Sequence, residues 1–242
     1  MILAGGKGTR MKQDFAKVLA LVAGKSMIER VLDVVNNFVD KPVVVVGFDR
    51  EKVMAEVGDR AIFAIQEAQK GTGHAVLCAK EKFNGFSGSI IVLYGDHPLV
   101  SGETIKKLFE LREKNSSEVA MLTTKVSDFE DWRARFFSFG RIIRGNSGKI
   151  EGIVELKNAT EEQKQILEVN PGYYCFDSVW LWDNIEKLSD QNNQKEFLLT
   201  DLIAICVAEG KEIATETVEP IECIGINTPE ELLEAERIIN NK

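Results

Sequence analysis

Cysteine and histidine are scarce in this chain, which has 4 Cys and 2 His among 242 residues. The cysteines lie far apart and form no C-x-x-C pair, at positions Cys78, Cys175, Cys206 and Cys223. A structural zinc site needs about four Cys or His ligands at close spacing. The sequence therefore excludes the zinc-stabilised classes of domain.

Long apolar runs are absent as well. The longest ones, around residues 43–46 and 90–94, have the length of strands, whereas a membrane-spanning helix needs roughly 20 apolar residues. The first residues do not show a basic segment followed by an apolar one, as a signal peptide would. We therefore expect a cytoplasmic protein that has no membrane partner.

Positive charge is not concentrated anywhere in the sequence. The formal net charge is -8 and no long Lys/Arg run occurs, which argues against a nucleic-acid partner. An acidic protein can still hold polyphosphate if it supplies local lysines, backbone N–H groups or a bound cation. Neither G-x-x-x-x-G-K-[ST] nor G-x-G-x-x-G is present, so the sequence has no Walker A loop and no dehydrogenase fingerprint.

Strands and helices alternate through the first half of the chain. This alternation predicts an α/β fold, with a mostly parallel sheet and helices on both of its faces. After about residue 117 the pattern becomes β-rich, which predicts a mixed part of the sheet. The expected strands are 1–4, 43–47, 61–65, 89–94, 119–126, 141–144, 149–155, 169–176 and 221–224. No linker or repeat interrupts the chain, so we predict a single domain over 1–242 with two lobes, about 1–117 and 118–242.

Helix starts are marked by local signals. Ser26 and Glu29 form a capping-box pair ahead of an apolar helical pattern. Thr228, Pro229 and Glu231 form a second such start, with Pro at the first helical position. Further helices are expected near Gly73 and after Ser101.

The residues directly after each strand are the informative ones, because ligands of open α/β sheets bind at the carboxyl ends of the strands. The first such stretch, residues 3–11, contains three glycines whose backbone N–H groups can converge on phosphate oxygens. Lys7, Arg10 and the later Lys17 can add positive charge. The alternative is an ordinary tight turn between a strand and a helix.

Gln66 ends the next informative strand and is followed by a glycine turn, Gly71-Thr72-Gly73-His74-Ala75. A side-chain amide offers both a donor and an acceptor, which reading a base edge requires. The alternative is a turn that simply opens a helix. His74 is expected to be a helix-start residue and not a base.

Asp96 follows a third apolar strand, within Tyr94-Gly95-Asp96-His97-Pro98-Leu99. An Asp at a strand end can hold Mg²⁺ against a triphosphate, because this hard cation prefers few carboxylates together with waters and phosphate oxygens. Asn227 can supply a second, neutral oxygen ligand. The alternatives are that Asp96 stabilises a turn and that Asn227 caps a helix. We do not expect His97 to act as a base.

Taken together, these stretches resemble sugar nucleotidyltransferases, and most closely the uridyltransferase domain of bacterial N-acetylglucosamine-1-phosphate uridyltransferases. The resemblance runs in order along essentially the whole chain. It is carried by L-A-G-G-K-G-T-R-M at 3–11, A-K-V-L at 16–19, Gln66, G-T-G-H-A at 71–75, Y-G-D-H-P-L at 94–99, F-G-R-I at 139–142, G-I-V-E at 152–155, N-A-T-E-E-Q-K-Q-I at 158–166 and G-I-N at 225–227.

The resemblance implies a Rossmann-like nucleotidyltransferase fold, with a nucleotide-binding lobe at about 1–117 and a sugar-binding lobe at about 118–242. It implies three catalytic residues, Arg10, Lys17 and Asp96, and Mg²⁺ held by Asp96 and Asn227. The implied nucleotide contacts are Leu3, Ala4, Gly5, Gly6, Gly8, Thr9, Lys17, Gln66, Gly71 and Thr72. The implied sugar contacts are Tyr94, Gly95, Gly140, Glu155 and Asn170.

The implied reaction is transfer of UMP from UTP to N-acetylglucosamine 1-phosphate. The sequence departs from the family at Phe139, Pro171 and Leu198, so glucose 1-phosphate as the sugar and dTTP or CTP as the nucleotide stay open. A non-catalytic nucleotide-sugar sensor is a further alternative, while a glycosyltransferase would usually carry D-x-D.

Two further expectations follow from the same comparison. The family's left-handed β-helix is missing from this sequence, so we expect no acetyltransferase activity. We also expect a monomer or a weak homo-oligomer.

Overall fold

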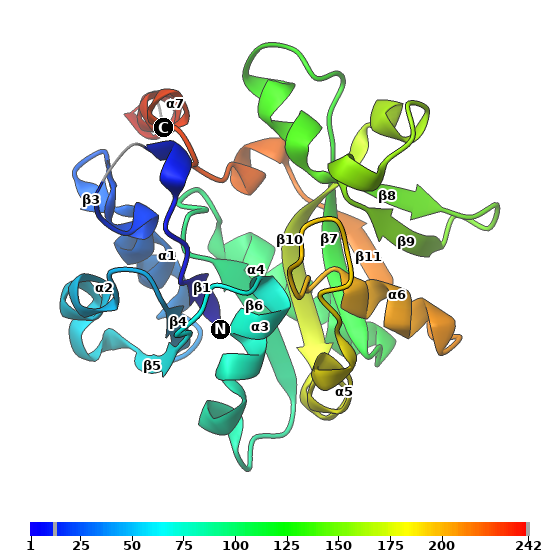
Figure 1. Ribbon diagram of the computed structural model, residues 1–242, viewed down its shortest axis with the longest axis horizontal. Helices are drawn as coiled ribbons and strands as arrows, with labels where there is room; N and C mark the ends of the chain where they lie inside the picture. Colours follow the sequence, from blue (N-terminus) through cyan, green and yellow to red (C-terminus); the bar gives the residue numbers. More distant parts are fainter. Residues whose placement is uncertain (12–13, 241–242) are drawn as a thin grey trace.

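The computed structural model describes residues 1–11 and 14–240 (Figure 1). Within them, nine strands form one sheet, and β2 (Leu21–Val22) and β3 (Lys25–Ser26) form a small separate hairpin. The nine strands are β1 (Ile2–Ala4), β4 (Val43–Val46), β5 (Ile62–Ile65), β6 (Ser89–Tyr94), β7 (Val119–Lys125), β8 (Gly140–Arg144), β9 (Ile150–Val154), β10 (Glu168–Asp177) and β11 (Ala214–Thr217).

The main path of the sheet runs in the order β11-β7-β10-β6-β1-β4-β5. Strands β6, β1, β4 and β5 are parallel to one another, and β11 is parallel to β7. Along this path of described strands, β10 alone runs against its neighbours, β6 and β7. Strands β8 and β9 extend from β10 as an antiparallel pair, on the right of Figure 1. The predicted α/β class with a mostly parallel sheet is confirmed.

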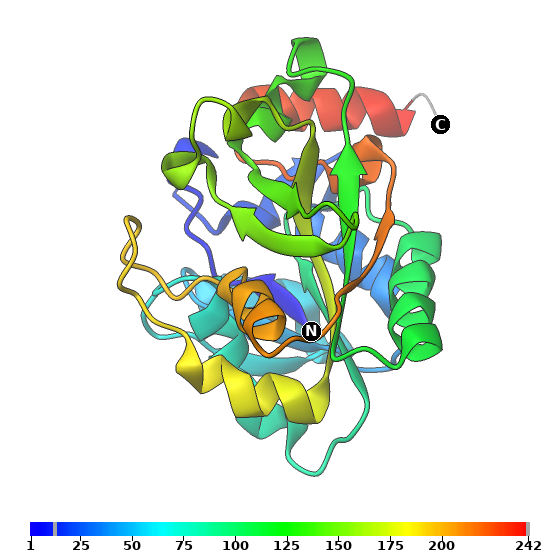
Figure 2. The ribbon, with the colours of Figure 1, turned by 90° about the vertical axis from the view of Figure 1, so that its right-hand side faces the viewer.

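Helices cover both faces of the sheet. On one face, α1 (Met27–Val35), α2 (Arg50–Val57), α4 (Gly102–Asn115) and α7 (Pro229–Asn240) bury apolar side chains in one core cluster. On the other face, α3 (Thr72–Cys78), α5 (Ser178–Asn184) and α6 (Asp201–Ala208) contribute to a second cluster. Figure 2 shows α4 on one side of the sheet and α5 with α6 on the other.

Strand β4 shows why some strands of this sheet are apolar at every position. Val44 and Val46 belong to the first core cluster, and Val43 and Val45 belong to the second. Successive side chains of a strand point to opposite faces, and both faces of this sheet are covered by helices. Every position of the strand is therefore buried.

Both predicted capping boxes are confirmed. The Ser26 hydroxyl accepts a hydrogen bond from the Glu29 N–H at 3.3 Å, and the Glu29 carboxylate accepts from the Ser26 N–H at 3.2 Å. At α7, Thr228 accepts from the Glu231 N–H at 3.2 Å, and Glu231 accepts from the Thr228 N–H at 3.1 Å. These bonds satisfy the N–H groups that the first turn of a helix leaves open.

The strand predicted at 221–224 is wrong. This segment forms a 3-10 helix, Pro220–Cys223. Pro220 has no N–H to give to a sheet ladder, and the Glu222 carboxylate accepts hydrogen bonds from the Ser101 N–H and the Thr104 hydroxyl at the start of α4. The apolar side chains that suggested a strand, among them Cys223 and Ile224, are buried in the first core cluster instead.

None of the helices in the described part of the chain has both the length and the apolar character to cross a membrane.

Candidate active site

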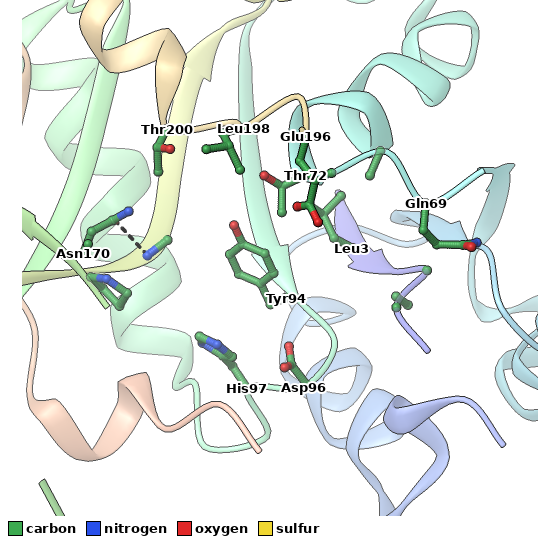
Figure 3. A pocket seen from close by; sticks show the side chains of 18 of the residues that line it. Leu3, Gln69, Thr72, Tyr94, Asp96, His97, Asn170, Glu196, Leu198 and Thr200 are labelled. Carbon is green, nitrogen blue, oxygen red and sulfur yellow. Dashed lines mark hydrogen bonds between the residues drawn. The ribbon is translucent and has the colours of Figure 1, made fainter. Parts of the chain in front are cut away.

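A cavity of about 480 Å³ opens at the carboxyl ends of β1, β5 and β6, where Gly5, Gln66 and Asp96 follow their strands (Figure 3). Its other wall comes from the β8 to β10 region and from the segment before α6. The sequence-predicted residues that line this cavity are Leu3, Ala4, Gly5, Gly6, Lys17, Gln66, Gly71, Thr72, Tyr94, Asp96, Gly140, Glu155 and Asn170. Both predicted lobes therefore contribute to one pocket.

The side chains of the two predicted magnesium ligands, Asp96 and Asn227, both contact Lys17. The Lys17 ammonium forms a short ion pair with the Asp96 carboxylate, and it donates a hydrogen bond to Asn227 Oδ1 at 2.8 Å. The Ile226 N–H also donates to the Asp96 carbonyl at 3.0 Å, which fixes the two segments against each other. Two oxygen donors far apart in sequence thus lie within reach of a single positive charge.

Asp96 is a carboxylate under neutral conditions. Its burial acts to raise the pKa, but the neighbouring Lys17 ammonium and then His97 outweigh that effect, so the pKa of Asp96 lies below its usual value. The Asp96 and Lys17 side chains are only 13% and 14% exposed. Solvent therefore screens this pair less than it would a surface pair.

The donor set fits Mg²⁺. A carboxylate and an amide carbonyl are both hard oxygen ligands, and Mg²⁺ usually takes one or two protein ligands and completes its shell with water and substrate phosphate. Across residues 1–11 and 14–240 there is no cluster of three or more His, Cys, Asp or Glu side chains that would form a closed metal cage. Two oxygen ligands of this kind suit an ion that arrives with a polyphosphate.

The glycine turn after β1 lies beside this pair. Gly5 and Gly6 line the cavity, and the Gly5 carbonyl accepts a hydrogen bond from the Phe48 N–H at 3.1 Å. Gly8 has φ +64°, and a Cβ added to it would lie 2.5 Å from Lys17 Cβ. Glycine at this position therefore leaves the space through which Lys17 reaches Asp96.

Not every predicted residue reaches the cavity. Gly8, Thr9, Arg10, Gly95 and Asn227 are not among the described residues that line it. Thr9 and Arg10 are exposed in a 3-10 turn, Thr9–Met11. Gly95 is buried behind the wall, where its N–H donates to the Leu3 carbonyl at 2.9 Å.

Gln66 lines one side of the cavity. Its side chain is buried, and its Nε2 donates to the Gly71 carbonyl at 3.1 Å and lies 3.0 Å from His74 Nδ1. Thr72 closes the same corner, because its hydroxyl accepts a hydrogen bond from the Leu199 N–H at 2.9 Å. Gln66 and Thr72 are thus held by neighbours before any ligand arrives.

The opposite side of the cavity is polar and partly buried. Glu155 accepts a hydrogen bond from the Thr200 hydroxyl at 3.2 Å. Burial raises the pKa of Glu155, and the nearby Asp201 acts in the same direction. Asn170 donates to the Tyr174 hydroxyl at 2.6 Å and accepts from the Gly172 N–H at 3.0 Å, so its amide orientation is fixed.

Tyr94 separates these two sides (Figure 3). Burial, followed by the negative charges of Asp96 and Glu155, raises the pKa of its hydroxyl. The phenol therefore stays protonated and can donate a hydrogen bond to a ligand.

The surroundings of both histidines favour the neutral imidazole. Burial lowers the pKa of His97 despite the opposing charge of Asp96, and Nδ1 lies 3.1 Å from the Tyr173 hydroxyl. Burial and then Lys70 lower the pKa of His74. His97 lines the cavity, and the ring of Tyr94 lies 5.3 Å from its own ring.

A loop before α6 supplies cavity residues that the sequence did not indicate. They are Gln194, Glu196, Leu198 and Thr200, to which Gln69 adds a side chain from the turn before α3. Leu198 is also one of the positions at which the sequence departs from the family that it resembles. Two backbone hydrogen bonds of 2.8 Å hold the loop in place. The Phe197 N–H donates to the Lys70 carbonyl, and the Phe197 carbonyl accepts from the Gly73 N–H.

The wall around Gly140 depends on a buried guanidinium. Arg141 is fully buried and donates hydrogen bonds to the carbonyls of Phe137, Phe139 and Lys164. Its guanidinium carbon lies 5.1 Å from the ring centre of Phe137. The segment that precedes Gly140 is thereby fastened against the cavity, which Ser138 and Phe139 line.

A comparison with protein families now identifies the fold. The family model described as the MobA-like NTP transferase domain matches residues 1–202. The chain belongs to this family. MobA-like NTP transferase domains are nucleotidyltransferases by their description, and the glycine turn and Asp96 lie inside the matched region.

Curated relatives of this MobA-like domain include bifunctional proteins GlmU. The protein from Halalkalibacterium halodurans is 38% identical over 244 residues, covering 100% of this chain and 52% of its own length. Those from Clostridium novyi and Caldicellulosiruptor saccharolyticus are 39% and 40% identical, covering 99% and 98% of this chain but 51% and 50% of their own lengths. The chain thus spans about half the length of these relatives.

Proposed function

We propose that this MobA-like domain transfers UMP from UTP to N-acetylglucosamine 1-phosphate, giving UDP-N-acetylglucosamine and pyrophosphate with the help of Mg²⁺. The observation that carries the proposal is the meeting of Asp96 and Asn227 on the Lys17 ammonium, beside a glycine turn. The similarity to GlmU proteins over the whole chain supports the choice of substrates.

The reaction needs no general base. A sugar 1-phosphate is already an anion at neutral pH, so it can attack the α-phosphorus of UTP directly. The obstacle is repulsion between two anions, together with charge that develops on the departing pyrophosphate. Mg²⁺ held by Asp96 and Asn227 would neutralise phosphate charge when bound.

The chain's own residues do the rest in this proposal. Lys17 and the N–H groups of Gly5 and Gly6 lie where they can bind phosphate oxygens. Arg10 is exposed and outside the cavity lining, so we assign the larger electrostatic effect to Lys17. Catalysis is then positioning together with charge neutralisation.

Substrate recognition is divided between the two sides of the cavity. We assign the base and ribose to Gln66, Gly71 and Thr72, and the amino sugar to Glu155 and Asn170. Gly140 and Tyr94 complete the sugar side. Glu155 and Asn170 offer acceptors and a donor suited to the N-acetyl and hydroxyl groups of a hexosamine.

A panel of UTP, CTP and dTTP crossed with N-acetylglucosamine 1-phosphate and glucose 1-phosphate tests the substrate assignment. Pyrophosphate release is measured with the purified chain and Mg²⁺. We expect UTP with N-acetylglucosamine 1-phosphate to give the highest kcat/KM. A higher value for another pair would reassign the substrate, and nucleotide-sugar binding without pyrophosphate release would favour a non-catalytic sensor.

A further inference from the structure

The carboxamide of Gln66 has both of its hydrogens committed inside the protein. Gln66 is 4% exposed, and its Nε2 lies 3.1 Å from the Gly71 carbonyl and 3.0 Å from His74 Nδ1. The Gly71 carbonyl can only accept, so the nitrogen of the amide and not its oxygen must face this corner. His74 Nδ1 must then accept the second hydrogen, which places the ring proton on Nε2.

The group of Gln66 that remains for a ligand is its oxygen. A Cβ added to Gly5 would lie 2.8 Å from Gln66 Oε1, so this oxygen lies over the glycine turn. Gly5 and Gln66 both line the cavity. A bound base therefore meets an acceptor, and an acceptor selects a base edge that carries an N–H donor.

His74 itself stands behind the cavity. The described residues that line the cavity include Gln66 and Ala75 but not His74. The Cys78 sulfur lies 3.8 Å from His74 Nδ1. The centre of the Phe197 ring lies 6.4 Å from the centre of the His74 ring. Any effect of His74 on a nucleotide must therefore act through Gln66.

We propose that His74 is a positioning residue for base selection, because its unprotonated Nδ1 takes one amide hydrogen of Gln66 and leaves only Oε1 for the base. The inference rests on the proposed function and deepens it. Uracil presents an N–H at position 3, which suits this acceptor, whereas the same position of cytosine is itself an acceptor. His74 thereby favours UTP over CTP without touching the nucleotide.

Replacing His74 by Leu tests this role. The variant removes one of the two acceptors that hold the Gln66 nitrogen in this corner, so the carboxamide turns more readily and can then offer a donor to cytosine. We expect the ratio of kcat/KM for UTP to kcat/KM for CTP to fall about tenfold, the size of one lost hydrogen bond. The change should lie mainly in KM, because His74 does not contact the phosphates.

His74→Asn is the matched control. Its amide oxygen comes close to the position of Nδ1 and can accept the same hydrogen, so this variant should recover most of the selectivity lost in His74→Leu. An unchanged ratio in His74→Leu would overturn the inference, provided that the wild-type chain transfers uridylate. A wild-type chain that transfers no uridylate would overturn the proposed function instead.

Nitrogen NMR gives a readout that does not depend on activity. The chain has 2 His, and they should show opposite tautomers. Tyr173 donates its hydroxyl hydrogen to the Glu222 carbonyl at 2.6 Å, so it must accept from His97 Nδ1, which is therefore protonated. The signals of His74 are those that disappear in His74→Leu. We expect them to show an Nδ1 that carries no hydrogen; a protonated Nδ1 in His74 would contradict the inference.

Discussion

At the scale of single residues, the Lys17 ammonium joins the segments that carry Asp96 and Asn227. A buried carboxylate is unfavourable unless it has a partner, and here the partner is a cation that substrate phosphates can also bind. The same three side chains therefore stabilise the folded chain and are placed for phosphate chemistry.

Asp96→Ala should lower kcat about 100-fold or more while leaving the fold intact, because it removes the charged ligand of the proposed metal site. Pyrophosphate release measures the rate, and circular dichroism checks the fold. Asp33→Ala is a matched control, since Asp33 pairs with Lys25 and Arg60 on the surface. Near-normal turnover in Asp96→Ala would remove Asp96 from the metal site.

The ionisation of Glu155 should make the stability of the folded chain depend on pH. Its folded-state pKa is raised, chiefly by burial, so its contribution favours the folded state at low pH and is lost as the pH rises through that pKa. Glu155→Gln removes the buried charge and should be the more stable protein at pH 7.5.

Thermal unfolding at pH 7.5 and pH 4.5 measures this effect of Glu155→Gln. The difference in melting temperature should shrink at the lower pH, where the wild-type carboxyl gains its proton; a constant difference would contradict the assignment.

The KM for the sugar phosphate should rise about tenfold in Glu155→Gln, as expected for the loss of a charge-assisted hydrogen bond.

At the scale of elements, the loop before α6 depends on Gly71. Gly71 has φ +107°, and a Cβ added there would lie 2.5 Å from the Phe197 carbonyl. Gly71→Ala should therefore combine backbone strain with a steric clash and cost about 2 to 4 kcal/mol of unfolding free energy.

Gly210→Ala is the control for backbone strain alone. Gly210 has φ +72°, and an added Cβ there meets nothing within 4 Å, so this variant should cost only about 1 kcal/mol. Urea titration of both variants measures the difference. Equal losses would show that Gly71 does not hold the loop.

Local signals made most of the elements predictable. The runs at β4 and β6 are apolar because both faces of the sheet are covered, and the capping boxes at Ser26 and Thr228 act within four residues. The segment at 221–224 is also apolar except for Glu222. It was mispredicted because Glu222 binds the start of α4, which is distant in sequence.

The missed cavity residues have a similar cause. The loop with Glu196 and Thr200 is placed by the Asn192 side chain, which donates to the Glu196 carbonyl at 2.6 Å, and by backbone bonds to residues 70–73. Arg141 is held by carbonyls of two separate segments. Contacts of this kind leave no periodic pattern in the sequence.

At the scale of the whole molecule, β10 joins the predicted lobes, because it pairs with β6 on one side and β7 on the other. We therefore expect residues of both lobes to unfold together in urea. The three tryptophans all lie after residue 117, so their fluorescence reports the second lobe, while far-UV circular dichroism reports both. Coincident transitions are expected; a fluorescence transition at lower urea would indicate two independent domains.

The dependence of turnover on Mg²⁺ tests the central claim most directly. Pyrophosphate and UDP-sugar are measured for the purified chain with UTP and N-acetylglucosamine 1-phosphate, first in EDTA and then as Mg²⁺ is raised. We expect no turnover in EDTA, and equimolar appearance of both products as Mg²⁺ is added. No product at any Mg²⁺ concentration, or an undiminished rate in EDTA, would contradict a metal-assisted nucleotidyl transfer at Asp96 and Asn227.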